Sequence, residues 1–576
     1  MTKKSALQNS LMRPKDLDRR VFLTHFSGIG LSGTLLPGAL WTRIQERGEI
    51  TVEVLAEAEK IAGLEFSEEE REAMVRGLNQ NLESYEALRT ISIPNEVPPA
   101  LVFDPVLPGM EVPGESRPFR GTRPRPVTRP ANLEEVAFWP VTQLSELIRS
   151  RQVTSTELTR MYLDRLKRHA PTLECVVTLT EDLALQQAGR ADEELSVGRY
   201  RGPLHGIPWG GKDLLAVRGY RTTWGAKPFE DQVIEEDATV VRRLEEAGAV
   251  LVAKTTLGAL AMGDVWFGGK TRNPWNLEQG SSGSSAGSAS ATVAGLVGFS
   301  IGTETLGSIV SPSTRCGATG LRPTFGRVSR AGAMALSWSM DKIGPICRTV
   351  EDCALVLDAI HGADGLDPTA RTVPFNWDAG KPLTDIRIGF LASAFEDEES
   401  RTHEFDTGAL QELRRMGIGP IPVDLPDDFP LGAMRVVLNA EAGAAFDELT
   451  RSGRDDLLVR QDAGAWPNSF RRSRLIPAVE YIQANRLRTM VMGAVDRALG
   501  GIDVFITPSY GGDVLLMTNL TGHPVVVLPS GFTEEGTPVS ISFVGRLWGE
   551  ADTLRVALAW QEATGHHLKH PPLFSV

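Results

Sequence analysis

The feature that most restricts how this chain can fold is a run of small residues in its middle. Residues 280–308 read GSSGSSAGSASATVAGLVGFSIGTETLGS. By composition alone, such a run is typical of a flexible linker. Here it leads directly into the apolar residues 297–301 and lies inside a region of regular apolar periodicity, where a mobile linker has no place. We therefore expect the run to form tight turns packed into the core of a folded domain.

The second turn of this run is suited to nucleophilic catalysis. It spans residues 302–308 and ends at Ser308. Small residues let backbone N–H groups come close to a ligand, and converging N–H groups stabilise the oxyanion of a tetrahedral intermediate. A serine that closes such a turn is well placed to attack a carbonyl carbon. Its hydroxyl needs a base to accept the proton.

Lysine is a better candidate for this base than histidine. His205 and His523 lie in turn-like stretches, and we interpret both as structural. Most lysines are solvated, but Lys212 follows the sequence LHGIPWGG, whose apolar and small residues indicate burial. Burial lowers the pKa of a lysine because it disfavours the ammonium form. A neutral Lys212 could therefore accept a proton near pH 7.

Two other motifs offer alternative nucleophiles. Residues 283–287, GSSAG, fit the GxSxG nucleophile elbow with Ser285 as the nucleophile. That motif needs a strand directly before it, and we predict no strand in residues 273–279. Residues 339–342, SMDK, fit the SxxK motif, but no Ser-Asp-Asn or Lys-Thr-Gly companion follows. We interpret neither as the catalytic motif.

Composition divides the chain into four segments. In residues 1–45, Arg19 and Arg20 precede a weakly apolar stretch, which resembles a twin-arginine export signal, although no Ala-x-Ala cleavage site follows closely. Residues 46–92 read as a helical appendage with a capping box at Ser67 and Glu70. Residues 93–135 are dense in proline and form a linker or surface wrap, and residues 136–576 form the catalytic domain. We expect a periplasmic or secreted protein, or a cytoplasmic one if the segment is an ordinary N-terminal helix.

The catalytic segment has the pattern of an α/β protein. Short apolar runs at 249–254, 502–506, 525–528 and 539–544 alternate with helical or turn-rich segments. A mixture of this kind predicts a large mixed β-sheet covered by helices on both faces.

Charge and cysteine content exclude several functional classes. The net charge of −13 gives no attraction to nucleic acid or anionic lipid. The four cysteines, Cys175, Cys316, Cys347 and Cys353, show no CxxC spacing, and we expect buried free thiols. HExxH and EF-hand patterns are absent from the sequence, so we expect no metal and no cofactor. No apolar run approaches the roughly 18 to 20 residues that span a bilayer.

Taken together, these residues resemble the amidase signature family. Ser284-Ser285-Ala286-Gly287 matches the family's first serine block, and residues 302–308 match its Gly-Thr-Asp-x-Gly-Gly-Ser turn. The spacing between the two catalytic serines, Ser284 and Ser308, is also that of the family. The resemblance runs from about residue 136 to the end and includes further segments at 202–213, 316–324, 341–348 and 521–524.

The resemblance implies a role for each site residue. Ser308 would form a covalent acyl-serine intermediate, while Ser284, which follows a cis peptide bond in the family, would pass the proton to Lys212. Ser285 would support this network by hydrogen bonding. The oxyanion hole would consist of the N–H groups of Thr305, Leu306, Gly307 and Ser308.

The sequence departs from the family pattern at three places. Glu304 replaces an aspartate, Leu306 replaces a glycine, and Ser282-Gly283 replaces a glycine pair. None of these changes removes a reacting group, although Leu306 can shape the approach of the substrate.

Three functions fit this sequence. The first is a free-standing amidohydrolase that acts on a small-molecule amide. The second is an A-type glutaminase subunit of a tRNA-dependent amidotransferase, which the export-like N-terminus disfavours because tRNA is cytosolic. The third is a non-catalytic binding protein on the same fold, which the three intact catalytic positions disfavour. We favour the first function, with a homodimer as one option for its assembly, and expect the substrate loops within residues 391–477.

Overall fold

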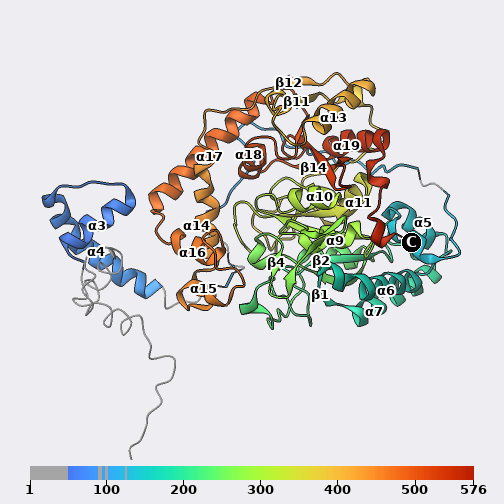
Figure 1. Cartoon of the computed structure of the whole chain (residues 1–576), viewed down its shortest axis with the longest axis horizontal. Helices are drawn as coiled ribbons and strands as arrows, with labels where there is room; N and C mark the ends of the chain where they lie inside the picture. Colours follow the sequence, from blue (N-terminus) through green and yellow to red (C-terminus); the bar gives the residue numbers. More distant parts are fainter. Residues whose placement is uncertain (1–49, 89–93, 96, 98–100, 124–125, 576) are drawn as a thin grey trace, which may run out of the picture. The chain divides into compact units, whose positions relative to one another are not determined.

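The computed structural model describes residues 50–88, 94–95, 97, 101–123 and 126–575. Contacts within the chain divide it into two units, Met1–Ile93 and Pro94–Val576. Figure 1 colours both along the sequence. The expected export signal, residues 1–45, lies outside the described residues.

The first unit contains two helices, α3 (Val52–Ala62) and α4 (Glu68–Leu88). Helix α3 ends at Gly63, whose φ of 66° suits a residue without a side chain. The expected capping box precedes α4, because the Ser67 N–H donates to Glu70 (2.7 Å) and the Glu70 N–H donates to Ser67 Oγ (3.3 Å). An ion pair between Arg71 and Glu59 at 2.9 Å joins the two helices.

The second unit is built on one mixed sheet of eleven strands in the order β1-β3-β2-β8-β10-β9-β14-β15-β13-β11-β12. The strands of this sheet are β1 Val176–Leu179, β2 Pro208–Lys212, β3 Val250–Thr255, β8 Phe299–Glu304, β9 Thr319–Arg322, β10 Lys342–Cys347, β11 Ile388–Leu391, β12 Ile421–Val423, β13 Val504–Pro508, β14 Val525–Phe532 and β15 Pro538–Gly545. Strand β2 pairs in parallel with β3 and β8, and β11 pairs in parallel with β12 and β13, whereas the other pairs are antiparallel. The predicted mixed sheet is confirmed.

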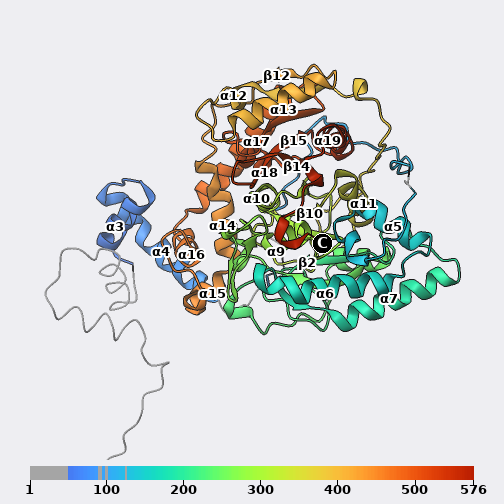
Figure 2. The ribbon, with the colours of Figure 1, turned by 45° about the vertical axis from the view of Figure 1, so that its right-hand side comes forward.

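Helices cover both faces of this sheet (Figures 1 and 2). Their bounds are α5 Val141–Arg149, α6 Ser155–Leu173, α7 Glu181–Ser196, α8 Thr239–Glu246, α9 Ala286–Val293, α10 Val310–Cys316, α11 Val350–Ile360, α12 Ala392–Phe395, α13 His403–Arg415, α14 Val436–Ala445, α15 Asp447–Arg451, α16 Trp466–Ser473, α17 Ala478–Ala498, α18 Val514–Thr521 and α19 Glu550–Thr564. Successive side chains of a strand point to opposite faces, so in β10 Ile346 packs with Ala289 of α9, whereas Ile343 and Cys347 pack on the side of α11. Within the described residues, no helix is long and apolar enough to cross a membrane.

One prediction about local structure is wrong. Residues 273–279, where we expected no strand, belong to a short hairpin of β6 (Arg272–Asn273) and β7 (Asn276–Gly280) outside the main sheet. Its tight turn is Pro274-Trp275, where proline fixes the first corner and Asn273 Oδ1 accepts the Trp275 N–H at 3.1 Å. The residues of this hairpin are largely polar, so a search for short apolar runs does not predict it. A second hairpin, β4 (Val265–Trp266) with β5 (Gly269–Lys270), precedes it.

The proline-rich segment is packed onto the second unit. Asn95 forms two hydrogen bonds with the backbone of Ala335, and Thr122 donates to the carboxylate of Glu351. The ring of Phe103 lies 5.0 Å from that of Phe325. The segment therefore has contacts of a surface wrap rather than of a free linker.

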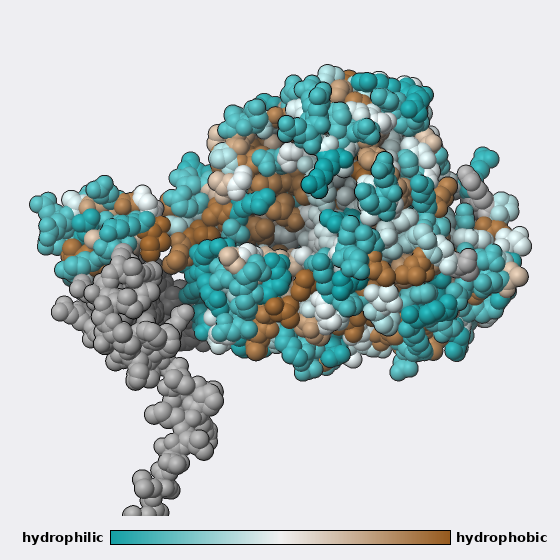
Figure 3. Space-filling view, viewed as in Figure 1, coloured by the Kyte–Doolittle hydropathy of each residue, from teal (hydrophilic) through white to brown (hydrophobic). Residues whose placement is uncertain are grey.

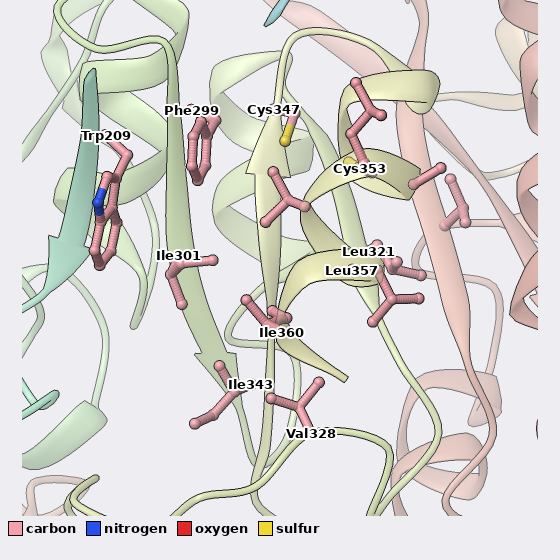
Figure 4. Close-up of a cluster of buried hydrophobic side chains, with 14 of the residues drawn as sticks. Trp209, Phe299, Ile301, Leu321, Val328, Ile343, Cys347, Cys353, Leu357 and Ile360 are labelled. Atoms are coloured by element: carbon pink, nitrogen blue, oxygen red, sulfur yellow. The ribbon is translucent and has the colours of Figure 1, made fainter. Parts of the chain in front are cut away.

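The core beneath α11 is a continuous apolar cluster (Figure 4). The rings of Trp209 in β2 and Phe299 in β8 stack with their planes 9° apart and their centroids 6.1 Å apart. All four cysteines are buried free thiols, as expected, and Cys347 and Cys353 belong to this cluster. Packing of neighbouring strands against this cluster fixes the ends of β2 and β8, where the site residues lie.

We expect Phe299→Ala to lower the free energy of unfolding by about 3–5 kcal/mol, because it leaves a cavity beside Trp209 in a fully buried position. Urea unfolding followed by fluorescence measures this change. Val197→Ala, at a position 81% exposed, is the control and should change the midpoint little. Equal midpoints for the two variants would show that the β2–β8 packing does not limit stability.

Candidate active site

Lys212 is the last residue of β2 and is completely buried. Two glycines before it allow the close strand packing that buries it. A Cβ on Gly210 would lie 3.0 Å from Thr255 Cγ2, and one on Gly211 would lie 3.2 Å from the Trp209 ring. Both distances are tighter than ordinary van der Waals contact, so a side chain at residue 210 would press on β3, and one at residue 211 would displace the Trp209 ring of β2 itself.

The amine of Lys212 is surrounded by hydroxyl groups. Its Nζ lies 2.8 Å from Ser284 Oγ, 2.8 Å from Thr303 Oγ1 and 3.1 Å from Ser285 Oγ. It also lies 3.3 Å from the Thr303 carbonyl oxygen. Burial lowers the pKa of Lys212 to about 7, although the carboxylates of Asp341 and Glu304 act in the opposite direction. The amine can therefore be neutral at physiological pH and accept a proton from Ser284.

Burial alone does not distinguish this lysine. Lys254, at the other face of the same β2–β3 pair, is equally buried but forms an ion pair with Asp213 at 2.8 Å. Burial lowers the pKa of both lysines, but at Lys254 the Asp213 carboxylate opposes this through an ion pair, whereas the nearest partners of Lys212 are uncharged. The groups that surround the amine therefore distinguish a structural lysine, such as Lys254, from a candidate catalytic base, such as Lys212.

Ser284 and Ser285 lie where the chain enters α9, and the Gly283–Ser284 peptide bond is cis. Gly283 leaves no room for a side chain, because an added Cβ would lie 1.9 Å from the Gly263 carbonyl oxygen. Ser285 Oγ bridges the Lys212 amine and strand β8. It accepts the Thr303 N–H and donates to the Thr303 carbonyl oxygen, both at 3.1 Å. Because this hydroxyl is buried and occupied, Ser285 is poorly placed to act as an exposed elbow nucleophile.

Ser308 lies beside these serines and is the most accessible of the three. Its carbonyl oxygen accepts the Ser285 N–H at 3.1 Å, which brings the two serine segments together. Its residue exposure is 8%, against 1% for Ser284 and none for Lys212. Among the described residues, Ser308 Oγ has no hydrogen-bond partner, so the link from Ser308 to Ser284 is open in this structure. Catalytic hydrogen bonds in ligand-free enzymes often close only when the substrate binds.

The turn before Ser308 presents free backbone donors. Within the described part of the chain, no protein acceptor takes the N–H groups of Thr305, Leu306, Gly307 or Ser308. Gly307 has a φ of 83°, a conformation that favours glycine. Such converging donors can bind an oxyanion.

Glu304 holds the far end of this turn. Its Oε2 accepts the N–H groups of Ile309 (2.8 Å) and Val310 (3.0 Å), and its Oε1 accepts from Arg322 (2.7 Å). Burial by itself raises the pKa of Glu304, but Arg322 and the Val310 N–H more than offset this and lower it to about 2. The carboxylate stays ionised, so glutamate here performs a holding function in the position where the family has aspartate.

The other residues named from the sequence lie apart from this chemistry. His205 Nε2 is 2.9 Å from the Ala191 carbonyl oxygen, and His523 Nδ1 is 2.7 Å from Thr521 Oγ1, and both histidines are buried. Leu306 is partly buried and packs against an apolar cluster that includes Val310 and Met517.

Sequence reasoning missed two residues of the site. Thr303 binds Lys212 through its side chain and its carbonyl oxygen, and Asp341 accepts the Thr305 hydroxyl at 2.6 Å. Thr303 lies inside the second motif block. Asp341 lies inside the SMDK sequence. Only the pairing of β10 with β8 shows that it lies next to the oxyanion turn.

Comparison with known proteins agrees with this geometry. Residues 157–513, more than half of the chain, match the family model described as Amidase. The chain belongs to the amidase signature family. It is 34% identical over 477 residues to the A-type subunit of glutamyl-tRNA(Gln) amidotransferase from Heliobacterium modesticaldum, covering 75% of this chain and 98% of the relative. The corresponding protein of Moorella thermoacetica is also 34% identical, over 484 residues, covering 76% of this chain and 99% of the relative.

Solved structures of amidase signature enzymes share the fold. The peptide amidase from Stenotrophomonas maltophilia is 30% identical with a TM-score of 0.67, covering 77% of this chain and all of that one. A bacterial aryl acylamidase, 22% identical with a TM-score of 0.65, covers 75% of this chain and 98% of that one and shows the fold alone.

The pKa of Lys212 sets a pH dependence. A neutral amine accepts a proton and an ammonium does not, so kcat/KM for an amide should rise about tenfold per pH unit below pH 7 and level off above it. Lys212→Ala should remove this limb and leave a weak rate that grows at alkaline pH. A profile with the same limb in both proteins would exclude Lys212 as the base.

Proposed function

We propose that this amidase signature protein hydrolyses carboxylic amides through a covalent acyl intermediate on Ser308. One observation carries the proposal: a fully buried lysine amine lies 2.8 Å from Ser284 Oγ, and the neighbouring Ser308, less buried than either, ends a turn with free N–H groups. A binding protein on this fold needs none of these features.

The reaction follows from the positions of these groups. Ser308 Oγ attacks the carbonyl carbon while its proton passes to Ser284 Oγ, whose own proton passes to Lys212 Nζ. The oxyanion forms against the N–H groups of residues 305–308. The C–N bond then breaks, and the proton returns from Lys212 through Ser284 to the departing amine. Water attacks the acyl-Ser308 ester by the same proton route and releases the carboxylic acid.

A cavity of about 500 Å³ next to α10 and α18 can hold the substrate's acyl or amine group. Its lining includes Thr314 of α10, six residues after Ser308 (314 − 308), or roughly two helical turns. A Cβ on Gly307 would lie 3.3 Å from Leu515 Cδ2, so the oxyanion turn abuts α18 itself. The apolar part of the lining consists of Leu391, Leu425, Phe429, Leu431, Val514 and Met517. Figure 3 shows apolar side chains gathered in a hollowed area beside α18.

The charges of this cavity favour neutral or cationic substrates. Asp397, Asp427 and Asp513 are on its wall, and its described lining contains no lysine, arginine or histidine. A substrate with a free carboxylate would therefore meet three negative groups without a cation to bind it.

A second candidate function is the A-type component of a tRNA-dependent amidotransferase. The names of the 34% identical relatives favour it more directly than they favour a free-standing hydrolase. It would require protein partners and would supply ammonia from glutamine. Free glutamine carries an α-carboxylate. The lining of the larger cavity contains no cation to bind that group, whereas the smaller cavity against Thr303 and Thr305 includes Arg330.

A panel of amides separates these functions. We expect the protein alone to hydrolyse aryl, aliphatic and aminoacyl amides at least tenfold better, in kcat/KM, than free glutamine. Ser308→Ala should abolish turnover, and Ser284→Ala should leave a small residue of it. Release of ammonia from glutamine only on addition of the other two amidotransferase components, with no turnover of the other amides, would instead support the second function.

We also propose export through the twin-arginine pathway, on the basis of Arg19 and Arg20 in the sequence. Replacing both by lysine should retain the protein in the cytoplasm, because that pathway reads the arginine pair. Cell fractionation followed by immunoblotting measures the distribution. Identical fractionation of the variant and the parent protein would contradict export by this route.

A further inference from the structure

The carboxylate of Asp341 lies at the entry of the oxyanion turn. Strand pairing places it there, because β10 pairs antiparallel with β8 with Lys342 opposite Glu304, so that residue 341 comes opposite residue 305. Asp341 Oδ1 accepts the Thr305 hydroxyl at 2.6 Å. Its Oδ2 accepts the N–H groups of Leu336 (2.8 Å) and Ser337 (3.0 Å). Burial raises the pKa of Asp341, whereas these three donors favour its ionised form.

Two carboxylates therefore hold the turn from opposite ends. Glu304 binds the N–H groups that follow Ser308, and Asp341 binds the side chain of Thr305, where the free donors begin. Close packing does not fix the entry side, because a cavity of about 80 Å³ lies against Thr303, Thr305 and Asp341. The hydrogen bond from Thr305 is the contact that fixes this side chain.

The loop that carries Asp341 is itself anchored. The Ser337 hydroxyl donates to Glu441 Oε2 of α14 at 2.6 Å, and Ser339 Oγ donates to Glu441 Oε1 at 2.7 Å. Arg488 of α17 donates to Ser339 Oγ and to its carbonyl oxygen, both at 2.8 Å. A buried network that is satisfied in this way is rigid, so Asp341 is a fixed point for the turn.

Asp341 also lies in the neighbourhood of the Lys212 amine, because Lys212 binds Thr303 and Asp341 binds Thr305, two residues farther along the same segment. Two carboxylates, Asp341 and Glu304, act on that amine, and Asp341 has the larger effect. Glu304 is neutralised by Arg322 at 2.7 Å, whereas in the described part of the chain Asp341 has no lysine or arginine within ion-pair distance. Arg330 and the buried Lys342 act on it from farther away. The remaining groups around Lys212 are the uncharged Ser284, Ser285 and Thr303.

We propose that Asp341 is a positioning residue for the reaction: its carboxylate holds the Thr305 end of the oxyanion turn and presents a fixed negative charge to Lys212. This inference rests on the proposed amide hydrolysis at Ser308. It gives a function to a residue within the SMDK sequence, which as an SxxK motif had none.

Three variants separate the two effects of Asp341. Thr305→Val removes the hydroxyl and keeps the charge, Thr305→Ser keeps both, and Asp341→Asn removes the charge. Misplacement of catalytic groups by about 1 Å costs up to roughly a hundredfold in rate, so Thr305→Val should lower kcat about tenfold or more without moving the acid limb of the pH profile. Thr305→Ser should restore most of kcat. Asp341→Asn should lower kcat and move the acid limb to lower pH, because loss of a nearby negative charge disfavours the ammonium form of Lys212.

Glu351→Gln is the matched control. Glu351 of α11 is a buried carboxylate that also accepts a threonine hydroxyl, that of Thr122 at 2.6 Å, but neither residue lines the site or its cavities. Its profile should equal that of the parent protein. Labelling of Ser308 by a fluorophosphonate, measured as a rate against pH and as a final stoichiometry, counts the folded sites in every variant without requiring an amide substrate.

The outcomes distinguish this inference from the proposed function. An unmoved acid limb in fully labelled Asp341→Asn, or an unchanged kcat in Thr305→Val, overturns the inference while amide hydrolysis stands. No amide turnover by the parent protein, with no labelling of Ser308, overturns the proposed function itself. If Asp341→Asn does not fold, the Thr305→Val and Thr305→Ser variants decide. A fall in kcat in Thr305→Val that is equally large in Thr305→Ser also contradicts the inference.

Discussion

The site depends on one physical constraint, which is that an amine has been removed from water without receiving a carboxylate in return. Burial of Lys212 among three hydroxyls and a carbonyl oxygen disfavours its ammonium form and brings its pKa to about 7. Lys254, one strand away, is also buried and its pKa is also lowered by burial, but its amine is paired with the Asp213 carboxylate, which opposes that shift. Among the described residues, Lys212, Lys254 and Lys342 are all buried, and of the three only Lys212 lies among side-chain hydroxyl groups without an ion-pair partner.

The remainder of the site is arranged around that amine. Glycines at 210, 211, 283 and 302 occupy places where an added Cβ would press on a neighbouring group. At Gly302 such a Cβ would lie 2.8 Å from Ser285 Oγ, one of the hydroxyls that binds the amine. Ionised Glu304 and the half-buried Asp341 then hold the turn that presents the free N–H groups. Close packing sets the distances, and the carboxylates set the orientation of the donors.

Family membership and specific activity are separate questions for this chain. Its similarity to A-type components of amidotransferases and to a peptide amidase is nearly equal, at 34% and 30% identity, so kinship identifies amide chemistry and not the amide that is cleaved. We propose that this choice depends on the cavity beside α10 and α18, whose charge favours neutral or cationic groups. The relatives' names and the cavity thus favour different answers, and the substrate panel addresses this difference directly.

The sequence by itself determined the class of the fold and the residues that could react. Apolar runs at 249–254 and 525–528 became β3 and β14, because alternation and burial are local properties of a segment. The two serine blocks and Lys212 were also visible locally, since a glycine-rich turn and an apolar approach to a lysine leave marks in the sequence. The polar hairpin β6–β7 left no such mark, because its turn rather than an apolar run defines it.

Thr303 and Asp341 could be assigned to the site only from the tertiary structure. Strand pairing brings Thr303 to Lys212, 91 positions away in the sequence, and Asp341 to Thr305, 36 positions away. Whether a buried lysine is a cation or a base was decided in the same way, because the answer depends on which atoms the fold places around the amine.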